Sequence, residues 1–188
     1  MISQVQVGFY NLLKLWPETS ARNTVYAVGD VIKPTTYASH SYKCTTAGTS
    51  HASVEPTWTT TNGNTTTDGT AVFTCFNSKT YQVKAPQGST VPYVTFGMET
   101  DTPMGVFGNQ EDWESLTYWV NVFSSISAAH VSAIADLVME VMDDASLTVD
   151  GYTGMKCVRE FIGTIIWDYE VGIYQIPMRY RVWVDKDD

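Results

Sequence analysis

Hydrophobic residues recur along this chain with two different periods, and each period predicts a type of element. From Ile2 to Trp16 they recur every three or four positions, the spacing of an amphipathic helix, with Ser3 as a candidate cap and Pro17 as the stop. The same spacing returns between Ser127 and Met142, where the acidic side chains fall off the apolar stripe. The pattern therefore predicts two helices.

Four other segments alternate apolar and polar residues or are rich in β-branched and aromatic residues, which is typical of strands. In the last of them one face would carry Ile176, Met178, Tyr180, Val182 and Val184, and the other Gln175, Arg179, Arg181 and Trp183. The predicted strands are Tyr93–Glu99, Leu116–Phe123, Met155–Trp167 and Ile173–Val184.

Strands joined by short turns pair antiparallel, and two amphipathic helices can cover one apolar face of such a sheet. We therefore expect an α+β fold, with two helices packed on a mainly antiparallel sheet of about four strands.

Residues 17–80 differ from this pattern. They are crowded with Thr, Ser, Gly and Asn, show no helical period, and contain short β-rich runs between turn pairs such as Asn62-Gly63 and Asp68-Gly69. We predict that residues 1–16 and 81–188 form one α+β domain, and that residues 17–80 form a small all-β module inserted into it.

Charge supports the same division. The chain of 188 residues has a net charge of −9, yet residues 17–80 hold four basic and four acidic side chains, so the whole excess lies on the remaining residues. An acidic body repels phosphates, which argues against nucleic-acid binding as its main task. No apolar run approaches the roughly 20 residues of a membrane helix, and the first residues lack the features of a secretory signal. We expect a soluble protein made in a cytoplasm.

No combination of residues in the sequence indicates catalysis, a metal or a cofactor. His40, His51 and His130 are isolated, and the acidic run from Met142 to Gly151 lacks the alternation of a calcium loop. Cys44, Cys75 and Cys157 form no C-x-x-C pair; Cys44 and Cys75 could face each other on neighbouring strands, but free thiols are the simpler expectation. We predict that the protein is not an enzyme.

The candidate functional residues are therefore on surfaces. Arg179 and Arg181 on the outward face of the last strand could meet DNA or an acidic patch of a neighbouring copy, and the acidic body favours the second. Trp119 and Trp183 are large for a small core, so they are candidates for a subunit or tube interface, although core positions would also explain them.

The body carries a longer pattern: APQGSTVPYVTF, a Gly-containing loop, WESLTYWVNVFSS, the helix SAAHVSAIADLVMEVM, and a closing YEVGIYQIPMRYRVWV. With the first helix, this order of segments resembles the tail-completion, or tail-terminator, proteins of tailed bacteriophages. The resemblance covers the first helix and residues 84–185.

This resemblance implies a structural virion protein that forms a ring, usually a hexamer, at the junction of tail and neck. The ring would cap the tail tube, stack on the tail tube protein and meet a head-proximal neck or connector protein, with a sheath protein as a further partner. DNA would pass through its lumen without specific binding, and assembly would take place in the cytoplasm of the bacterial host.

The inserted segment departs from that family, whose members have a short connection there. Its sequence is similar to small β modules of phage tails and distantly to chitin-type carbohydrate-binding modules. That similarity implies an alternative, a glycan-binding decoration or adhesion protein, with Tyr37, Tyr42 and Trp58 as the sugar-stacking residues. We favour the simpler interpretation that Tyr42 and Trp58 form the core, because so small a module has few other large side chains to bury.

Overall fold

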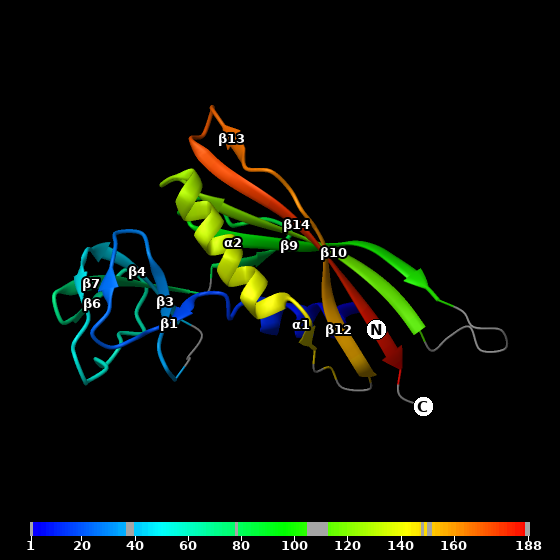
Figure 1. The fold of residues 1–188 in the computed structure, drawn as a ribbon, viewed down its shortest axis with the longest axis horizontal. Coiled ribbons are helices and arrows are strands. Elements are labelled where there is room, and N and C mark those ends of the chain that lie inside the picture. The colour runs from blue at the N-terminus through cyan, green and yellow to red at the C-terminus, as the bar shows by residue number, and fades with distance from the viewer. Residues whose placement is uncertain are drawn as a thin grey trace. The chain divides into compact units, whose positions relative to one another are not determined.

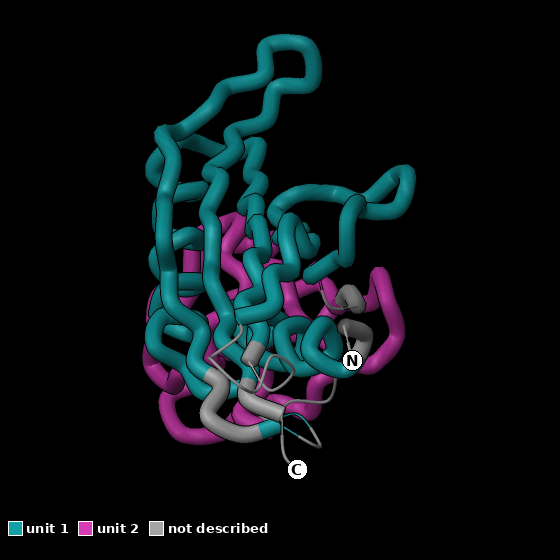
Figure 2. Tube along the Cα trace, turned by 90° about the vertical axis from the view of Figure 1, so that its right-hand side faces the viewer, with its two compact units in different colours: residues 1–16, 80–188 teal, residues 17–79 magenta. Residues whose placement is uncertain are grey.

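The computed structural model describes residues 2–36, 40–77, 79–104, 113–147, 149 and 152–186. The chain divides into two compact units, which are coloured separately in Figure 2. The first unit holds residues 1–16 and 80–188, and the second holds residues 17–79. Each is described by itself.

The first unit is built on one large sheet. Its strands are β8 (Thr80–Gln82), β9 (Tyr93–Pro103), β10 (Trp113–Ser124), β11 (Ala145–Ser146), β12 (Tyr152–Ile162), β13 (Ile166–Asp168) and β14 (Ile173–Lys186). They lie in the order β11-β12-β14-β10-β9-β8, and β13 pairs with β14 off this path. All the pairs are antiparallel except β8 with β9.

Two helices pack on one face of this sheet, α1 (Ile2–Leu13) and α2 (Ala128–Met142), and α2 crosses in front of the strands in Figure 1. The ring of Phe9 on α1 stacks on Tyr118 of β10 at 4.3 Å between ring centroids, and it also meets Phe96 and Tyr180. These rings are buried, so they form the centre of the core of this unit.

The start of α2 is fixed by a side-chain cap. Ser127 is the N-cap residue, and its Oγ accepts a hydrogen bond of 3.1 Å from the backbone N–H of His130. The His130 ring in turn shares a hydrogen bond of 2.8 Å with the buried Ser124 at the end of β10. The turn from strand to helix is therefore held by polar contacts at both ends.

The second unit is a small β structure. Its strands are β1 (Glu18–Thr19), β2 (Val25–Tyr26), β3 (Val31–Lys33), β4 (His40–Thr46), β5 (Gly48–Thr49), β6 (Thr65–Asp68) and β7 (Ala71–Asn77). One sheet has the order β1-β3-β4-β7-β6, and β2 pairs with β5 in a second.

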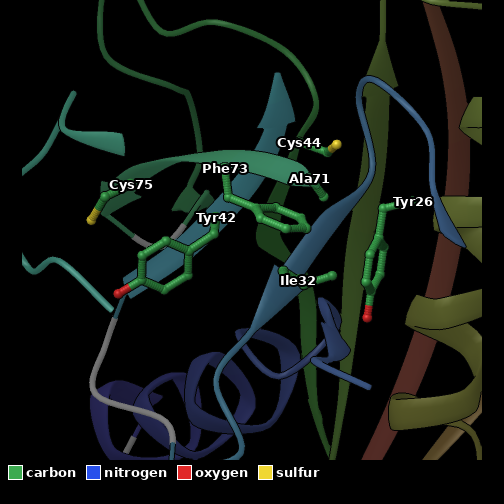
Figure 3. Close-up of a cluster of buried hydrophobic side chains, with 7 residues drawn as sticks. All are labelled: Tyr26, Ile32, Tyr42, Cys44, Ala71, Phe73 and Cys75. Carbon is green, nitrogen blue, oxygen red and sulfur yellow. The ribbon is translucent and has the colours of Figure 1, made fainter. Parts of the chain in front are cut away.

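Seven buried side chains from β2, β3, β4 and β7 fill this second core, as Figure 3 shows. This unit also holds a partly buried ion pair: the Arg22 guanidinium makes a 2.8 Å contact with Asp68, whose side chain is fully covered. Asp68 also accepts a 2.8 Å hydrogen bond from the N–H of His51. Because this unit has few apolar side chains in its core, the ion pair and the hydrogen bond to Asp68 also contribute to its stability.

The predicted fold class is wrong. The described residues form fourteen strands in three sheets and two helices, so the protein is mostly β and is not an arrangement of two helices on a four-stranded sheet. The reason is strand length: strands such as β1, β2, β5 and β11 have two residues each, and β8 and β13 have three. Such segments are too short to show an alternation of apolar and polar residues. They form strands only because a neighbouring strand supplies their hydrogen bonds.

Cysteine pairing follows from the register of β4 and β7. Cys44 lies opposite Phe73, and Cys75 lies opposite Tyr42, so the two thiols do not face each other. Both are free and buried, as is Cys157.

Candidate interaction surface

The second face of the large sheet carries the residues predicted for an interface. Since α1 and α2 both pack on the opposite face, the described helices leave this one uncovered. Arg179, Arg181 and Trp183 project from β14, and Trp119 lies opposite Arg179 on β10. The structure therefore brings these four residues onto one face.

Both arginines are paired with carboxylates of the same chain. Arg179 makes two contacts of 2.9 Å with Glu99, in a fork-like arrangement. Arg181 contacts Glu160 and also donates a 3.1 Å hydrogen bond to Ser115. The positive charges are thus compensated locally, which weakens the case for either arginine as a free anion-binding group.

Trp119 lies flat across a glycine of the neighbouring strand. Gly97 of β9 is its register partner, and a Cβ built on Gly97 would stand 2.4 Å from a ring carbon of Trp119. The indole covers backbone that a side chain would otherwise occupy, as aromatic residues do beside strand glycines. Trp119 is consequently a fixed, half-buried part of the surface.

Beside Trp119 the segment from Val83 to Ser89 borders a groove on this face. The groove has a volume of about 450 Å³ and is lined on the sheet side by Tyr93, Thr95, Trp119, Asn121 and Phe123. Tyr93 and Phe123 pack together at 5.0 Å between ring centroids. Lys84 contributes a positive charge to its rim. A groove lined by aromatic and polar side chains is suited to contact with another protein, because aromatic residues are enriched at protein–protein interfaces.

The three aromatic residues proposed for sugar stacking have different positions. Tyr42 is buried and donates a 2.9 Å hydrogen bond to the carbonyl of Thr59. Trp58 packs against Tyr42 and Phe73 and donates to Glu55 at 2.9 Å. Tyr37 lies outside the described residues. Tyr42 is therefore part of the core and Trp58 is partly buried against it, and the glycan-binding alternative stays a prediction.

The described residues contain no group of three His, Cys, Asp or Glu placed to hold a metal ion. His51 accepts hydrogen bonds from two backbone N–H groups at its Nδ1, and the His130 ring shares a hydrogen bond with Ser124, so both have local structural contacts. Burial raises the pKa of Tyr118, Tyr180 and Cys157, which keeps these groups protonated at neutral pH. None of the described helices is both long enough and apolar enough to span a membrane.

One further surface is not among those predicted from the sequence. A hairpin arm, residues 161–174, runs from the end of β12 through β13 to the start of β14, and β13 marks it at the tip of the sheet in Figure 1. Six of its apolar side chains are between 42% and 89% exposed: Phe161, Ile162, Ile165, Ile166, Tyr169 and Val171. The sequence does indicate this surface. Residues 161–174 are apolar at both odd and even positions, whereas a strand with one exposed face alternates apolar and polar residues.

A comparison with protein families shows which family the chain belongs to. The model of the family described as "Tail completion protein gp17" matches residues 65–185, more than half of the chain. The chain belongs to this family. It is accordingly a structural protein of the bacteriophage tail, which confirms the predicted resemblance to tail-completion proteins.

The matched residues do not include the whole of either unit. The match begins at residue 65, so it includes β6 and β7 of the second unit and the strands of the first unit, but not α1. The resemblance of the inserted segment to chitin-type modules is left as a prediction.

Other comparisons add little to the family assignment. A chain of a solved structure titled "Virion of native gene transfer agent (GTA) particle" is 16% identical, with a TM-score of 0.48, over 57% of this chain and 79% of that one. No curated protein matches this sequence.

Proposed function

We propose that this protein is a ring-forming tail terminator, which caps the tail tube and joins the tail to the head or neck without catalysing a reaction. The observation that carries the proposal is the match of residues 65–185 to the tail completion family. The partners would be further copies of the chain in a hexameric ring, the tail tube protein below and a neck or connector protein above. A sheath protein is a further candidate.

The uncovered sheet face supports an assembly role. It presents half-buried aromatic residues, locally neutralised arginines and a groove of about 450 Å³, and the described helices leave it free. Interfaces enriched in aromatic and arginine side chains, with charges satisfied at the rim, are common among protein assemblies. Trp119, Arg179, Arg181 and Trp183 would therefore contact a neighbouring copy or the tube.

The acidic composition agrees with DNA passage through the centre of such a ring. A wall with excess negative charge repels phosphates, so DNA would slide through the lumen without binding. We place the protein at the junction of tail and neck, with assembly in the host cytoplasm.

Two measurements test the proposal. Native mass spectrometry of the purified protein should give one closed oligomer, and electron microscopy of virions carrying a labelled copy should locate it at the head-proximal end of the tail. A protein that stays monomeric at high concentration, or a label found elsewhere on the particle, would refute the ring-terminator role.

A further inference from the structure

The hairpin arm is an ordered structure. β13 pairs with the first residues of β14, with Trp167 opposite Tyr174, and their rings are 4.2 Å apart between centroids. At the tip, the Asp168 side chain accepts hydrogen bonds from the N–H groups of Glu170 and Val171, at 2.9 and 3.3 Å. The arm thus holds its apolar side chains in a defined arrangement, which lowers the entropic cost of binding a partner.

Both faces of the arm are apolar. Tyr174 continues the alternation of Ile176 and Met178 and so shares the face that the helices cover further along. Ile166 lies opposite Gln175 and therefore belongs to the other face, where it is 47% exposed. Strands that are apolar on both faces are normally buried on both faces, so the arm has the composition of an element that a partner covers.

A receptive surface lies at the opposite edge of the same sheet. β8 is the last strand of the described path on that side, whereas β13 pairs with β14 on the side away from β10. Between α1 and β8 is a cavity of about 330 Å³, lined by Gln6, Val7, Tyr10, Gln82 and Phe96. We call this surface the α1/β8 edge, together with Lys14, whose ammonium group lies 5.5 Å from the centre of the Tyr10 ring, and Lys84, which follows Gln82 by two residues.

The two surfaces differ in the sign of their charge. Residues 161–178 carry Asp168 and Glu170 and no Lys or Arg. Residues 2–16 and 80–98 carry Lys14 and Lys84 and no Asp or Glu, although the whole chain has a net charge of −9. The arm is therefore acidic, and the α1/β8 edge is a positively charged exception on an acidic protein, so the two are complementary.

We infer that the arm of one copy docks on the α1/β8 edge of a second copy of this chain. The arm's Ile and Tyr side chains fill the cavity beside Val7 and Tyr10, and its two carboxylates lie near Lys14 and Lys84. Because the two surfaces are on opposite edges of one sheet, the contact is head-to-tail, the type that forms a ring when the rotation between copies closes. The inference rests on the proposed ring and identifies the contact that joins its subunits.

Surface variants test the contact directly. The arm variant is Ile166→Ser with Tyr169→Ser and Val171→Ser, and the edge variant is Val7→Glu with Lys84→Glu. A control, Val28→Ser with Val54→Ser, changes two similarly exposed apolar residues in the second unit. Assembly is followed by analytical ultracentrifugation over a concentration series, and circular dichroism checks that each variant is folded.

We expect the control to assemble like the wild type, and the arm and edge variants to need about a hundredfold higher concentration for half-assembly. A mixture of arm and edge variants retains one functional contact per pair. It should therefore form a 1:1 dimer and nothing larger.

Charge exchange provides a second readout. Glu170→Lys should weaken assembly about threefold at low salt, as should Lys84→Glu, and combining the two changes in one chain should restore it. Asp168 is kept, because its side chain holds the turn at the tip of the arm. An arm variant that assembles like the wild type overturns the docking contact but leaves the ring proposal standing. A wild-type protein that never assembles overturns both, and no rescue by the combined exchange overturns the pairing of these two surfaces.

Discussion

At the scale of single residues, the contact between Trp119 and Gly97 shows how the uncovered sheet face is fixed. The indole occupies the space that a side chain on Gly97 would need, with backbone and ring in direct contact. A half-buried tryptophan held in this way offers a rigid aromatic surface at small entropic cost.

We predict that Gly97→Ala lowers the free energy of unfolding by about 1–3 kcal/mol, because the new methyl group forces the Trp119 ring out of position. Urea denaturation measures the change. In a Trp119→Ala background the same substitution should cost much less, since the clash is gone, and equal costs in both backgrounds would show that the ring is not the obstacle.

The buried thiols give a pH dependence. Burial raises the pKa of Cys44 to about 11 from an ordinary value near 9, so this thiol stabilises the fold fully below pH 9 and loses that contribution as the pH rises toward 11. The contribution to the free energy of unfolding should be about 1 kcal/mol smaller at pH 10 than at pH 8.

Comparison with Cys44→Ala isolates this effect, because the other titrating groups are common to both proteins. We expect the difference in unfolding free energy between wild type and variant to shrink from pH 8 to pH 10 under reducing conditions. A difference that is constant with pH would contradict the assignment.

At the scale of elements, α2 is positioned by the capping contact at its first turn. Ser127 satisfies the N–H of His130, and the His130 ring is tied to Ser124 of β10, so strand and helix are joined through side chains. This junction orients the apolar stripe of α2 toward the sheet.

We predict that Ser127→Ala lowers the free energy of unfolding by about 1 kcal/mol, through loss of the N-cap hydrogen bond. Ser132→Ala is the matched control within the same helix. The Ser132 hydroxyl only donates back to the carbonyl of Ala128, so its loss should change stability little or raise it slightly. Similar losses for both variants in thermal denaturation would argue against a specific cap.

At the scale of the whole molecule, the two residues that flank the second unit in sequence, Trp16 and Thr80, are in contact within the first unit. The indole N–H of Trp16 donates a 3.2 Å hydrogen bond to the hydroxyl of Thr80, and both residues are buried. A segment whose ends are this close can be lengthened or shortened at small entropic cost. This geometry supports the proposal that residues 17–79 form an inserted module.

We predict that replacing residues 17–79 with a short Gly-Ser connection leaves the first unit folded, because its core residues lie outside the removed segment. Circular dichroism and tryptophan fluorescence should show a cooperative unfolding transition. Trp16→Phe in the shortened chain tests the hydrogen bond between Trp16 and Thr80. We expect its loss to lower the free energy of unfolding by about 1 kcal/mol. A shortened chain without cooperative unfolding would refute the proposal.

Much of the element order could be predicted from the sequence, because it rests on local periods. The helical spacing before Trp16 and after Ser127 indicates α1 and α2, and the alternation from Gln175 to Val184 separates the buried from the less buried face of β14. The fold class was nevertheless wrong, because two- and three-residue strands leave no periodic trace and depend on hydrogen bonds from distant segments.

The sequence alone determined where hydrophobic and charged residues fall, and with them the family resemblance and the contrast between residues 17–80 and the rest. What those residues contact became clear from the folded chain. It paired Arg179 with Glu99, laid Trp119 on Gly97, placed Tyr42 in a core, and left the arm around Tyr169 exposed. The physical reason is that composition and period are properties of neighbouring residues, whereas pairing and exposure depend on which distant segments the fold brings into contact.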